Sequence, residues 1–178
     1  DVIMPGEGAD SITGGTGNDW FYYPNKNHAG DSITDFGVSG GQDKIVVGHN
    51  NPVSSFSRST IEVDSAALGS TYNIATHSNQ LPTIFNFTAN TANATSATGM
   101  ASQFSSFSVQ NGTSPLSITE KAFVVAGDGT HSYVYHWEDA DKCGNFVGEA
   151  TELTLIAKLD NFNNDSLTGT EFSFETIL

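Results

Sequence analysis

Short apolar runs in the last third of the chain, separated by Gly, Asp and Asn, set the pattern of its predicted elements. Each run is too short for a helix and is rich in β-branched and aromatic residues, which favours β-strands. Residues 127–130 read Gly-Asp-Gly-Thr, a turn sequence that predicts a hairpin between the runs on either side. We expect a β-meander over residues 115–178. Its predicted strands cover residues 122–126, 131–137, 153–157 and, last, 172–178.

The middle of the chain has a different pattern. Residues 48–88 are rich in Ser, Thr and Asn and hold short apolar runs at 61–63 and 84–87. Beyond them, Ala and large apolar residues recur at spacings of two to four, which predicts one helix over about 91–106. The apolar face of this helix, which we expect to pack on a sheet, carries Met100, Phe104 and Phe107.

The first part of the chain contains a nine-residue repeat. Residues 5–13 (PGEGADSIT) and 14–22 (GGTGNDWFY) both fit x-G-x-G-x-D-x-U-x, where U is large and apolar, and residues 1–4 fit the second half of the unit. The x-U-x half predicts a short strand that turns its U side chain inward, and the G-x-G-x-D half predicts a turn. Because the chain begins within a repeat, we expect the natural protein to extend further toward its N-terminus. The inward side chains are Ile3, Ile12 and Phe21.

This spacing gives each turn the chemistry of a calcium site. Glycines adopt backbone conformations closed to other residues, so successive carbonyl oxygens can point at one centre, and the aspartate adds a carboxylate. Calcium takes roughly six to eight oxygen ligands, so one turn supplies about half of the shell and the turn two repeats away supplies the rest. A Gly/Asp-rich loop without metal is the alternative, but successive units in register favour the site. The residues predicted to bind calcium from the repeats are Asp1, Pro5, Gly6, Glu7, Gly8, Asp10, Gly14, Gly15, Thr16, Gly17 and Asp19.

These repeats resemble the haemolysin-type calcium-binding repeat of RTX proteins. The next residues, 31–36 (DSITDF) and 41–45 (GQDKI), resemble the D-x-I-x-D-F…G-x-D-x-I element that follows the repeats in secreted members of that family. The resemblance implies that Asp31 completes the shell of the turn ending at Asp10, and that Asp43 serves the turn ending at Asp19. Two departures stand out. Pro5 replaces the first glycine of one turn but keeps a carbonyl, and two valines follow residue 45 where the family has an acidic and a small polar residue.

The C-terminal part also resembles a family segment. Residues 122–174, with a Tyr-rich strand, an Asp/Asn/Gly loop and an apolar strand, resemble the end of type I secretion substrates, S-layer proteins among them. The last four residues, Glu-Thr-Ile-Leu, resemble the tail of exported serralysin-type proteins, which carry an uncleaved C-terminal export signal. The resemblance implies a secreted, extracellular protein, at the cell surface or free, whose partner is the type I secretion machinery.

Composition narrows the function classes. The chain carries 20 acidic and 6 basic residues, a net charge of −14. Repulsion among the acidic side chains opposes a compact fold unless cations are held at fixed points. The same charge argues against a nucleic-acid partner. No apolar run is long enough for a membrane span. The single cysteine, Cys143, allows neither a disulfide within the chain nor a cysteine-based zinc site.

Other candidate sites are weaker. Asp139-x-Asp141-x-x-Gly144 resembles the start of an EF-hand loop, but Cys143 and Ala150 occupy its fifth and twelfth positions, so a polar hairpin loop is the preferred interpretation and a second calcium site the alternative. The five histidines show no metal-binding spacing, and there is no G-x-S-x-G sequence. We therefore expect no catalytic site and no enzymatic activity.

Together the patterns predict a mainly β fold with one helix. A short calcium-binding parallel β-roll and its closing element, residues 1–47, would cap an antiparallel β domain, residues 48–178, that ends in the export signal. The predicted function is a calcium-binding folding and secretion module of a larger extracellular bacterial protein exported by a type I system. Two alternatives stay open: an S-layer or adhesin segment that mediates cell-surface assembly, self-association or attachment, and the non-catalytic tail of a secreted protease or lipase.

Overall fold

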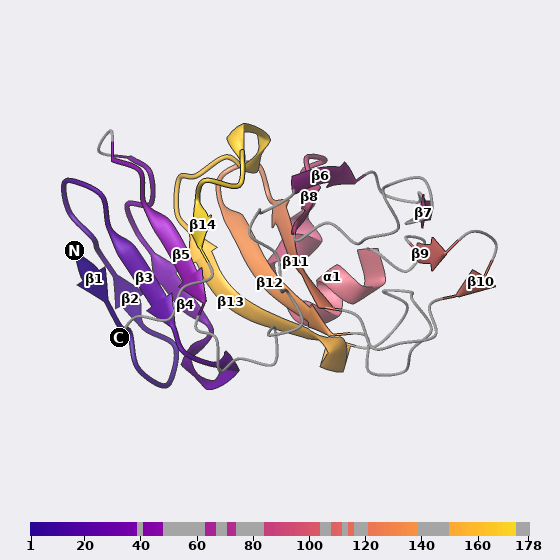
Figure 1. The fold of residues 1–178 in the computed structure, drawn as a ribbon, viewed down its shortest axis with the longest axis horizontal. Coiled ribbons are helices and arrows are strands. Elements are labelled where there is room, and N and C mark those ends of the chain that lie inside the picture. Colours follow the sequence, from indigo (N-terminus) through magenta and orange to yellow (C-terminus); the bar gives the residue numbers. More distant parts are fainter. Residues whose placement is uncertain are drawn as a thin grey trace.

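The computed structural model describes residues 1–38, 41–47, 63–66, 71–73, 84–103, 108–111, 114–115, 121–138 and 150–173 (Figure 1). The strands are β1 (Val2–Ile3), β2 (Ser11–Ile12), β3 (Trp20–Tyr23), β4 (Asp31–Ile33), β5 (Lys44–Val47), β6 (Val63–Ala66), β7 (Thr71–Asn73), β8 (Ile84–Phe87), β9 (Ser108–Asn111), β10 (Ser114–Pro115), β11 (Lys121–Gly127), β12 (Ser132–Glu138), β13 (Leu153–Leu159) and β14 (Phe172–Ser173). The helix is α1 (Ala97–Gln103), and short 3-10 segments cover Lys26–His28, Ala92–Thr95, Ala150–Glu152 and Asn164–Ser166. The fold is mainly β with one α-helix among these residues, as the sequence predicts.

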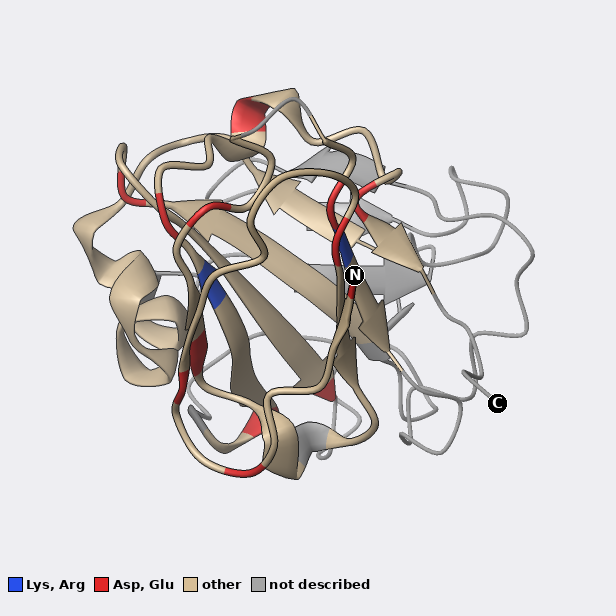
Figure 2. Cartoon of the chain, turned by 90° about the vertical axis from the view of Figure 1, so that its left-hand side faces the viewer, with Lys and Arg blue, Asp and Glu red and all other residues tan. Residues whose placement is uncertain are grey.

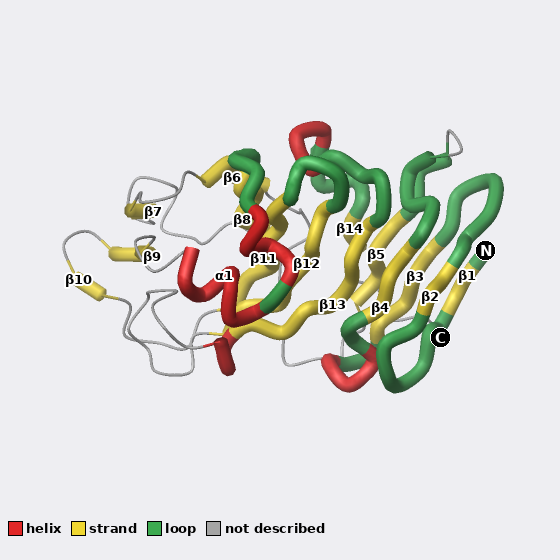
Figure 3. Tube along the Cα trace, turned by 180° about the vertical axis from the view of Figure 1, so that it is seen from behind, coloured by secondary structure: helices red, strands yellow, loops and turns green. Residues whose placement is uncertain are grey.

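The first five strands form a parallel coil that alternates between two sheets. β1, β3 and β5 lie side by side in one sheet, and β2 and β4 lie in the other. Val2 pairs with Trp20, two nine-residue repeats later, so the repeat length sets the register of the coil. Figure 3 shows the turns of this coil gathered at the two ends of its strands. We refer to residues 1–47 as the coil.

The predicted hairpin and meander are present at the centre of the seven-stranded sheet. β11 pairs antiparallel with β12, and β12 pairs antiparallel with β13. The hairpin turn at residues 127–130 contains Gly129 at a φ of +97°, a conformation that L side chains rarely adopt. The strands predicted at 122–126, 131–137 and 153–157 therefore match β11, β12 and β13 closely.

The expectation of an antiparallel domain is wrong outside this centre and the β9–β10 pair. β8 pairs with β11, and β6 with β8, in parallel, while β13 and β14 pair in parallel with the coil strands β4 and β5. An antiparallel pair can join neighbours in sequence through a tight turn, whereas parallel partners need a long connection. The pairs β4–β13 and β5–β14 join segments more than a hundred residues apart, which no local pattern reveals.

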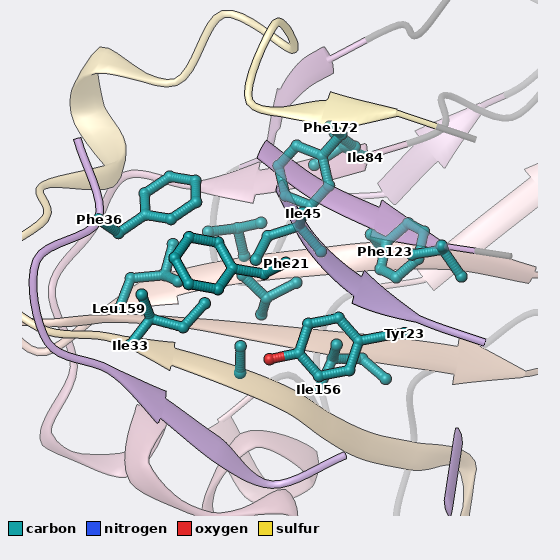
Figure 4. Close-up of a cluster of buried hydrophobic side chains, with 14 of the residues drawn as sticks. Phe21, Tyr23, Ile33, Phe36, Ile45, Ile84, Phe123, Ile156, Leu159 and Phe172 are labelled. Carbon is teal, nitrogen blue, oxygen red and sulfur yellow. The ribbon is translucent and has the colours of Figure 1, made fainter. Parts of the chain in front are cut away.

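The coil and the later strands share a core. The strand orders are β1-β3-β5-β14 in the four-stranded sheet and β2-β4-β13-β12-β11-β8-β6 in the seven-stranded sheet, so both sheets run from the coil into the C-terminal part. The buried cluster between them mixes side chains of both parts (Figure 4). Among its members are Phe21, Ile33, Phe36 and Ile45 of the coil and Phe123, Ile156, Leu159 and Phe172 of the later strands.

The predicted helix over 91–106 is shorter and interrupted. A 3-10 segment ends before Ser96, whose extended backbone has a φ of −147°, and α1 then begins at Ala97. The Ser96 hydroxyl accepts the amide of Gly99 at 3.0 Å, so it acts as an N-cap that fixes the start of the helix. Met100 is fully buried against the sheet, as predicted, while Phe104 and Phe107 lie outside the described residues.

Candidate metal-binding turns of the coil

Both predicted glycine turns have the backbone conformation that the repeat requires. Each turn contains two glycines in the left-handed region, where other residues are strained. Their φ values are +99° at Gly6, +110° at Gly8, +96° at Gly15 and +116° at Gly17. Glu7 and Thr16, at the tips of these turns, are exposed. A ligand inside the turn would therefore meet the main chain of these residues and not their side chains.

The aspartates of the repeats stack in two ladders along the coil. In the first, the Asp19 amide donates to Asp43 Oδ1 at 3.0 Å, and the N-terminal ammonium of Asp1 donates to Asp19 Oδ1 at 2.9 Å. In the second, the Asp10 amide donates to Asp31 Oδ1 at 2.8 Å. The structure thus brings together the pairs that the family resemblance implied, Asp10 with Asp31 and Asp19 with Asp43. Figure 2 looks at the coil from its N-terminal side and shows acidic segments spread around it and few basic ones.

The spacing D-x-U explains why these carboxylates are buried. Side chains alternate between the two faces of a strand, so the aspartate lies on the same inward face as the apolar residue two positions later. Asp19 and Asp31 are each only 1% exposed, and Asp43 is 7% exposed. Asp1 and Asp10 are exposed because they precede β1 and β2, which are the edge strands of the two sheets.

The buried carboxylates lack enough positive charge. Oδ2 of Asp19 and Oδ2 of Asp31 are both buried; the first has no hydrogen-bond partner, and the carboxylate of Asp31 interacts with the hydroxyl of Tyr23. Within the described ranges no lysine or arginine pairs with them, and Lys44, the neighbour of Asp43, lies over the ring of Trp20 at 5.8 Å from its centroid. A buried carboxylate without a cation costs several kcal/mol, roughly speaking. These two oxygens are therefore the points where a bound cation would stabilise the coil most.

Gly14 shows how closely one of these carboxylates lies against its own turn. A Cβ on Gly14 would lie 2.6 Å from Asp19 Oδ2, so only glycine leaves room for the carboxylate there. In the first turn Pro5 occupies the equivalent position, and its Asp10 side chain is exposed rather than folded over the turn. The two repeat turns share a backbone conformation but differ in the placement of their carboxylates.

Two residues at the other end of the coil were missed in the sequence. Tyr23 Oη and His28 Nδ1 are buried in the segment that leads from β3 to Asp31, and the Tyr23 hydroxyl interacts with the Asp31 carboxylate. Burial, and then the charge of Asp31, raises the pKa of Tyr23 well above its usual range, and burial likewise raises the pKa of Asp31. The alternation that turns Phe21 inward also turns Tyr23 inward and could have identified it, whereas His28 carries no spacing signal.

A third residue, Asp35, is the second aspartate of the D-x-I-x-D-F element, and its role was not predicted from the sequence. Its Oδ1 accepts the Gly14 amide at 2.9 Å and its Oδ2 accepts the Gly15 amide at 2.8 Å. The carboxylate of Asp35, which follows β4, thus binds two successive amides of the turn between β2 and β3.

Side-chain donors in the coil do not gather in one cluster. Among the described residues, no group of three or more His, Cys, Asp or Glu side chains is placed to hold a metal ion. The donor set of each turn is instead one or two carboxylates with main-chain carbonyl oxygens, which is a composition that calcium accepts. The weaker candidate, the loop at 139–149, lies outside the described residues.

Outside the coil, the hairpin turn between β11 and β12 contains a carboxylate that is fully paired. Asp128 accepts the amides of Thr130 and His131, each at 2.8 Å, and the hydroxyl of Tyr133, also at 2.8 Å. Burial acts to raise the pKa of Asp128, but these donors outweigh it and hold that pKa well below its usual value. His131 Nδ1 lies 3.3 Å from Asp128 Oδ2 and its Nε2 lies 3.4 Å from Asp160 Oδ1, so the imidazole contacts both carboxylates.

No family model, curated protein or solved structure matches the chain. Among the helices that the structure describes, none has the length and apolar character needed to cross a bilayer.

Proposed function

We propose that the chain is a calcium-binding folding module of a secreted protein, in which the coil is a calcium-loaded β-roll. The observation that carries the proposal is the buried, unpartnered Oδ2 of Asp19, together with the buried carboxylate of Asp31, in an acidic coil. Residues 1–47 contain seven acidic residues and two lysines, so the coil cannot neutralise its own charge. Divalent cations held in the turns would do so.

Calcium fits the turns better than other common metals. The turn ending at Asp19 offers carboxylate and carbonyl oxygens, the hard ligands that calcium and magnesium prefer. Glycine turns are flexible and irregular, which suits calcium, whereas magnesium requires nearly octahedral geometry and gives up its water reluctantly. Cysteine is absent from the coil, so soft metals that require thiolates are not favoured.

Calcium binding would act on the chain through folding. A ligand that binds only the folded state stabilises it in proportion to the logarithm of its concentration over Kd. Extracellular calcium sites bind at roughly 10⁻⁴–10⁻³ M, so such a module would be less stable inside a bacterium and would gain stability outside it. Export through a type I system, and a place in a larger extracellular protein, are proposals that rest on the sequence resemblance.

Calorimetric titration of the chelator-treated protein with Ca²⁺ tests this function. We expect binding with a Kd of roughly 10⁻⁴–10⁻³ M and a higher melting temperature in calcium than in EGTA. Magnesium at the same concentration should not substitute. Asp165→Asn, which removes an exposed carboxylate outside the coil, is the matched control for charge and should bind as the natural chain does. Absence of heat, together with equal melting temperatures in calcium and EGTA, would refute the proposal.

A further inference from the structure

The Gly14–Gly17 turn is held from outside by a carboxylate that is not one of its own. Asp35, which follows β4, accepts the amide of Gly14 with one oxygen and the amide of Gly15 with the other, at 2.9 and 2.8 Å. Successive amides that point at one anion form a nest, and the positive φ of Gly15, +96°, is what makes this possible. Charge-assisted hydrogen bonds of this length are among the stronger ones in proteins.

Fixing the amides also fixes the carbonyls. The described backbone contains no cis peptide, and the N–H and C=O of a trans peptide point in opposite directions. When Asp35 takes the amides of Gly14 and Gly15, the carbonyl oxygens of Thr13 and Gly14 are therefore turned away from Asp35. Oδ2 of Asp19 lies beside Gly14, without a hydrogen-bond partner of its own. The turn thus presents two amides to the Asp35 carboxylate and directs the two carbonyls of the same peptides away from that anion.

The other repeat turn cannot be held in this way. Pro5 stands at the position of Gly14 and has no amide hydrogen, so the first of the two bonds is excluded by its chemistry. In the segment that follows β3, the side chain of Asn25 accepts the amide of Asn27 within its own 3-10 turn. The turn at residues 5–10 consequently lacks the first amide of the pair that Asp35 binds, and comparison of the two turns provides an internal control.

We propose that Asp35 is a positioning residue: its carboxylate clasps the amides of Gly14 and Gly15 before metal binds, and so directs the carbonyls of this turn toward the cation. The inference rests on the proposed calcium function, because positioning matters only if the turn binds metal. Asp35 does not ligate the metal in this scheme. In this scheme the clasp orders the turn ending at Asp19 ahead of metal binding, so this turn binds calcium more tightly than the turn ending at Asp10.

Amide hydrogen exchange measures the clasp without reference to calcium. In EGTA, the amides of Gly14 and Gly15 should exchange on the order of tenfold more slowly in the natural chain than in Asp35→Ala. Asp35→Asn, which keeps one acceptor and loses the charge, should lie between them. Asp35→Glu keeps two acceptor oxygens and should restore part of the protection. Should Asp35→Ala fail to fold, the comparison of the natural chain with Asp35→Asn and Asp35→Glu decides the matter.

Terbium luminescence, excited on the long-wavelength side of tryptophan absorption, reports the metal site. Trp20 adjoins Asp19, so it should sensitise an ion in this turn, and Trp20→Phe should abolish the signal. Asp35→Asn should weaken Tb³⁺ and Ca²⁺ binding at this site on the order of tenfold, without changing the number of ions bound. Binding at the Asp10 turn, measured by calorimetry in Asp19→Asn, should not respond to the loss of Asp35. A purely structural role would weaken both sites alike.

Equal exchange of the two glycine amides in the natural chain and in Asp35→Ala would overturn the inference. Loss of one bound ion in Asp35→Asn, with amide protection unchanged, would also overturn it by making Asp35 a ligand. If the natural chain binds no calcium while the exchange difference is present, the clasp stands as a feature of the turn and the calcium function fails. The two failures are therefore distinguishable.

Discussion

Asp19→Asn should change stability in opposite directions with and without calcium. Asp19 is 1% exposed; its Oδ1 accepts a hydrogen bond from the N-terminal ammonium of Asp1, and its Oδ2 has no hydrogen-bond partner. Asparagine has the same shape and keeps one acceptor oxygen for Asp1, so the substitution chiefly removes the charge. The sign of its effect therefore reports whether that charge has a cation to interact with.

In EGTA the buried charge is a cost. Removing water from a carboxylate costs several kcal/mol, which its one ammonium partner does not fully return. The asparagine amide leaves one buried donor group without a partner, which costs roughly 1–3 kcal/mol. The difference predicts that Asp19→Asn is neutral or stabilising in EGTA, by up to about 1–2 kcal/mol.

In calcium the same change removes a binding site. At a calcium concentration of 100 times Kd, ligand linkage stabilises the folded state by about 2.7 kcal/mol. A domain of this size shifts its melting temperature by roughly 2–4 °C per kcal/mol. The variant should therefore melt about 5–10 °C below the natural chain in excess calcium, and at or above it in EGTA.

Thermal unfolding followed by near-ultraviolet circular dichroism, in EGTA and in excess calcium, provides the assay. Asp165→Asn is the control, because its carboxylate is exposed and lies outside the coil. If Asp19→Asn lowers the melting temperature equally in both solutions, the carboxylate has a purely structural role and the reasoning from its unpartnered oxygen is refuted.

Three further substitutions test the shared core, the space at the turn and the paired carboxylate of the hairpin. Phe21→Ala should cost roughly 3–5 kcal/mol, and tryptophan fluorescence should show a single transition, since a separate transition would mean that the coil unfolds alone. Gly14→Ala should weaken calcium binding in calorimetry, because its Cβ would lie 2.6 Å from Oδ2 of Asp19. Expressed as free energy, this loss of binding should exceed the loss of stability in EGTA. Asp128→Asn should cost roughly 2 kcal/mol at neutral pH. Because the folded pKa of Asp128 is lowered, that cost should disappear as the pH falls below 3.8 toward the folded value, which urea unfolding at several pH values would show.

Local features of the fold were predictable because they depend on neighbouring residues. Alternation places Asp19, just before β3, on the same inward face as Phe21 of β3, and the glycine spacing requires left-handed backbone at positions such as Gly15. Both the ladder and the turns therefore follow from the repeat. The hairpin at 127–130 follows from its turn residues in the same way. The interruption of the predicted helix at Ser96 was harder to foresee, since a hydroxyl can cap a helix or lie within one.

Long-range features were not predictable from one sequence. Nothing near β4 indicates that it pairs with β13, or that β5 pairs with β14, because parallel partners leave no turn between them. The role of Asp35 was hidden for a similar reason. Its partners, Gly14 and Gly15, are 21 and 20 residues away, and their distance in space depends on the coil register.

The shared sheets determine how far a cation in the coil would act. If the coil were a separate appendage, calcium would stabilise only its own turns, and the β11–β13 meander would unfold independently. The structure places β4 against β13 and β5 against β14, and buries Phe21 in one cluster with Phe123. Loss of the coil would expose that cluster and leave β13 and β14 without these parallel partners. Metal held at the turns of β1–β5 should therefore stabilise the C-terminal strands as well, although none of their described residues belongs to the proposed site.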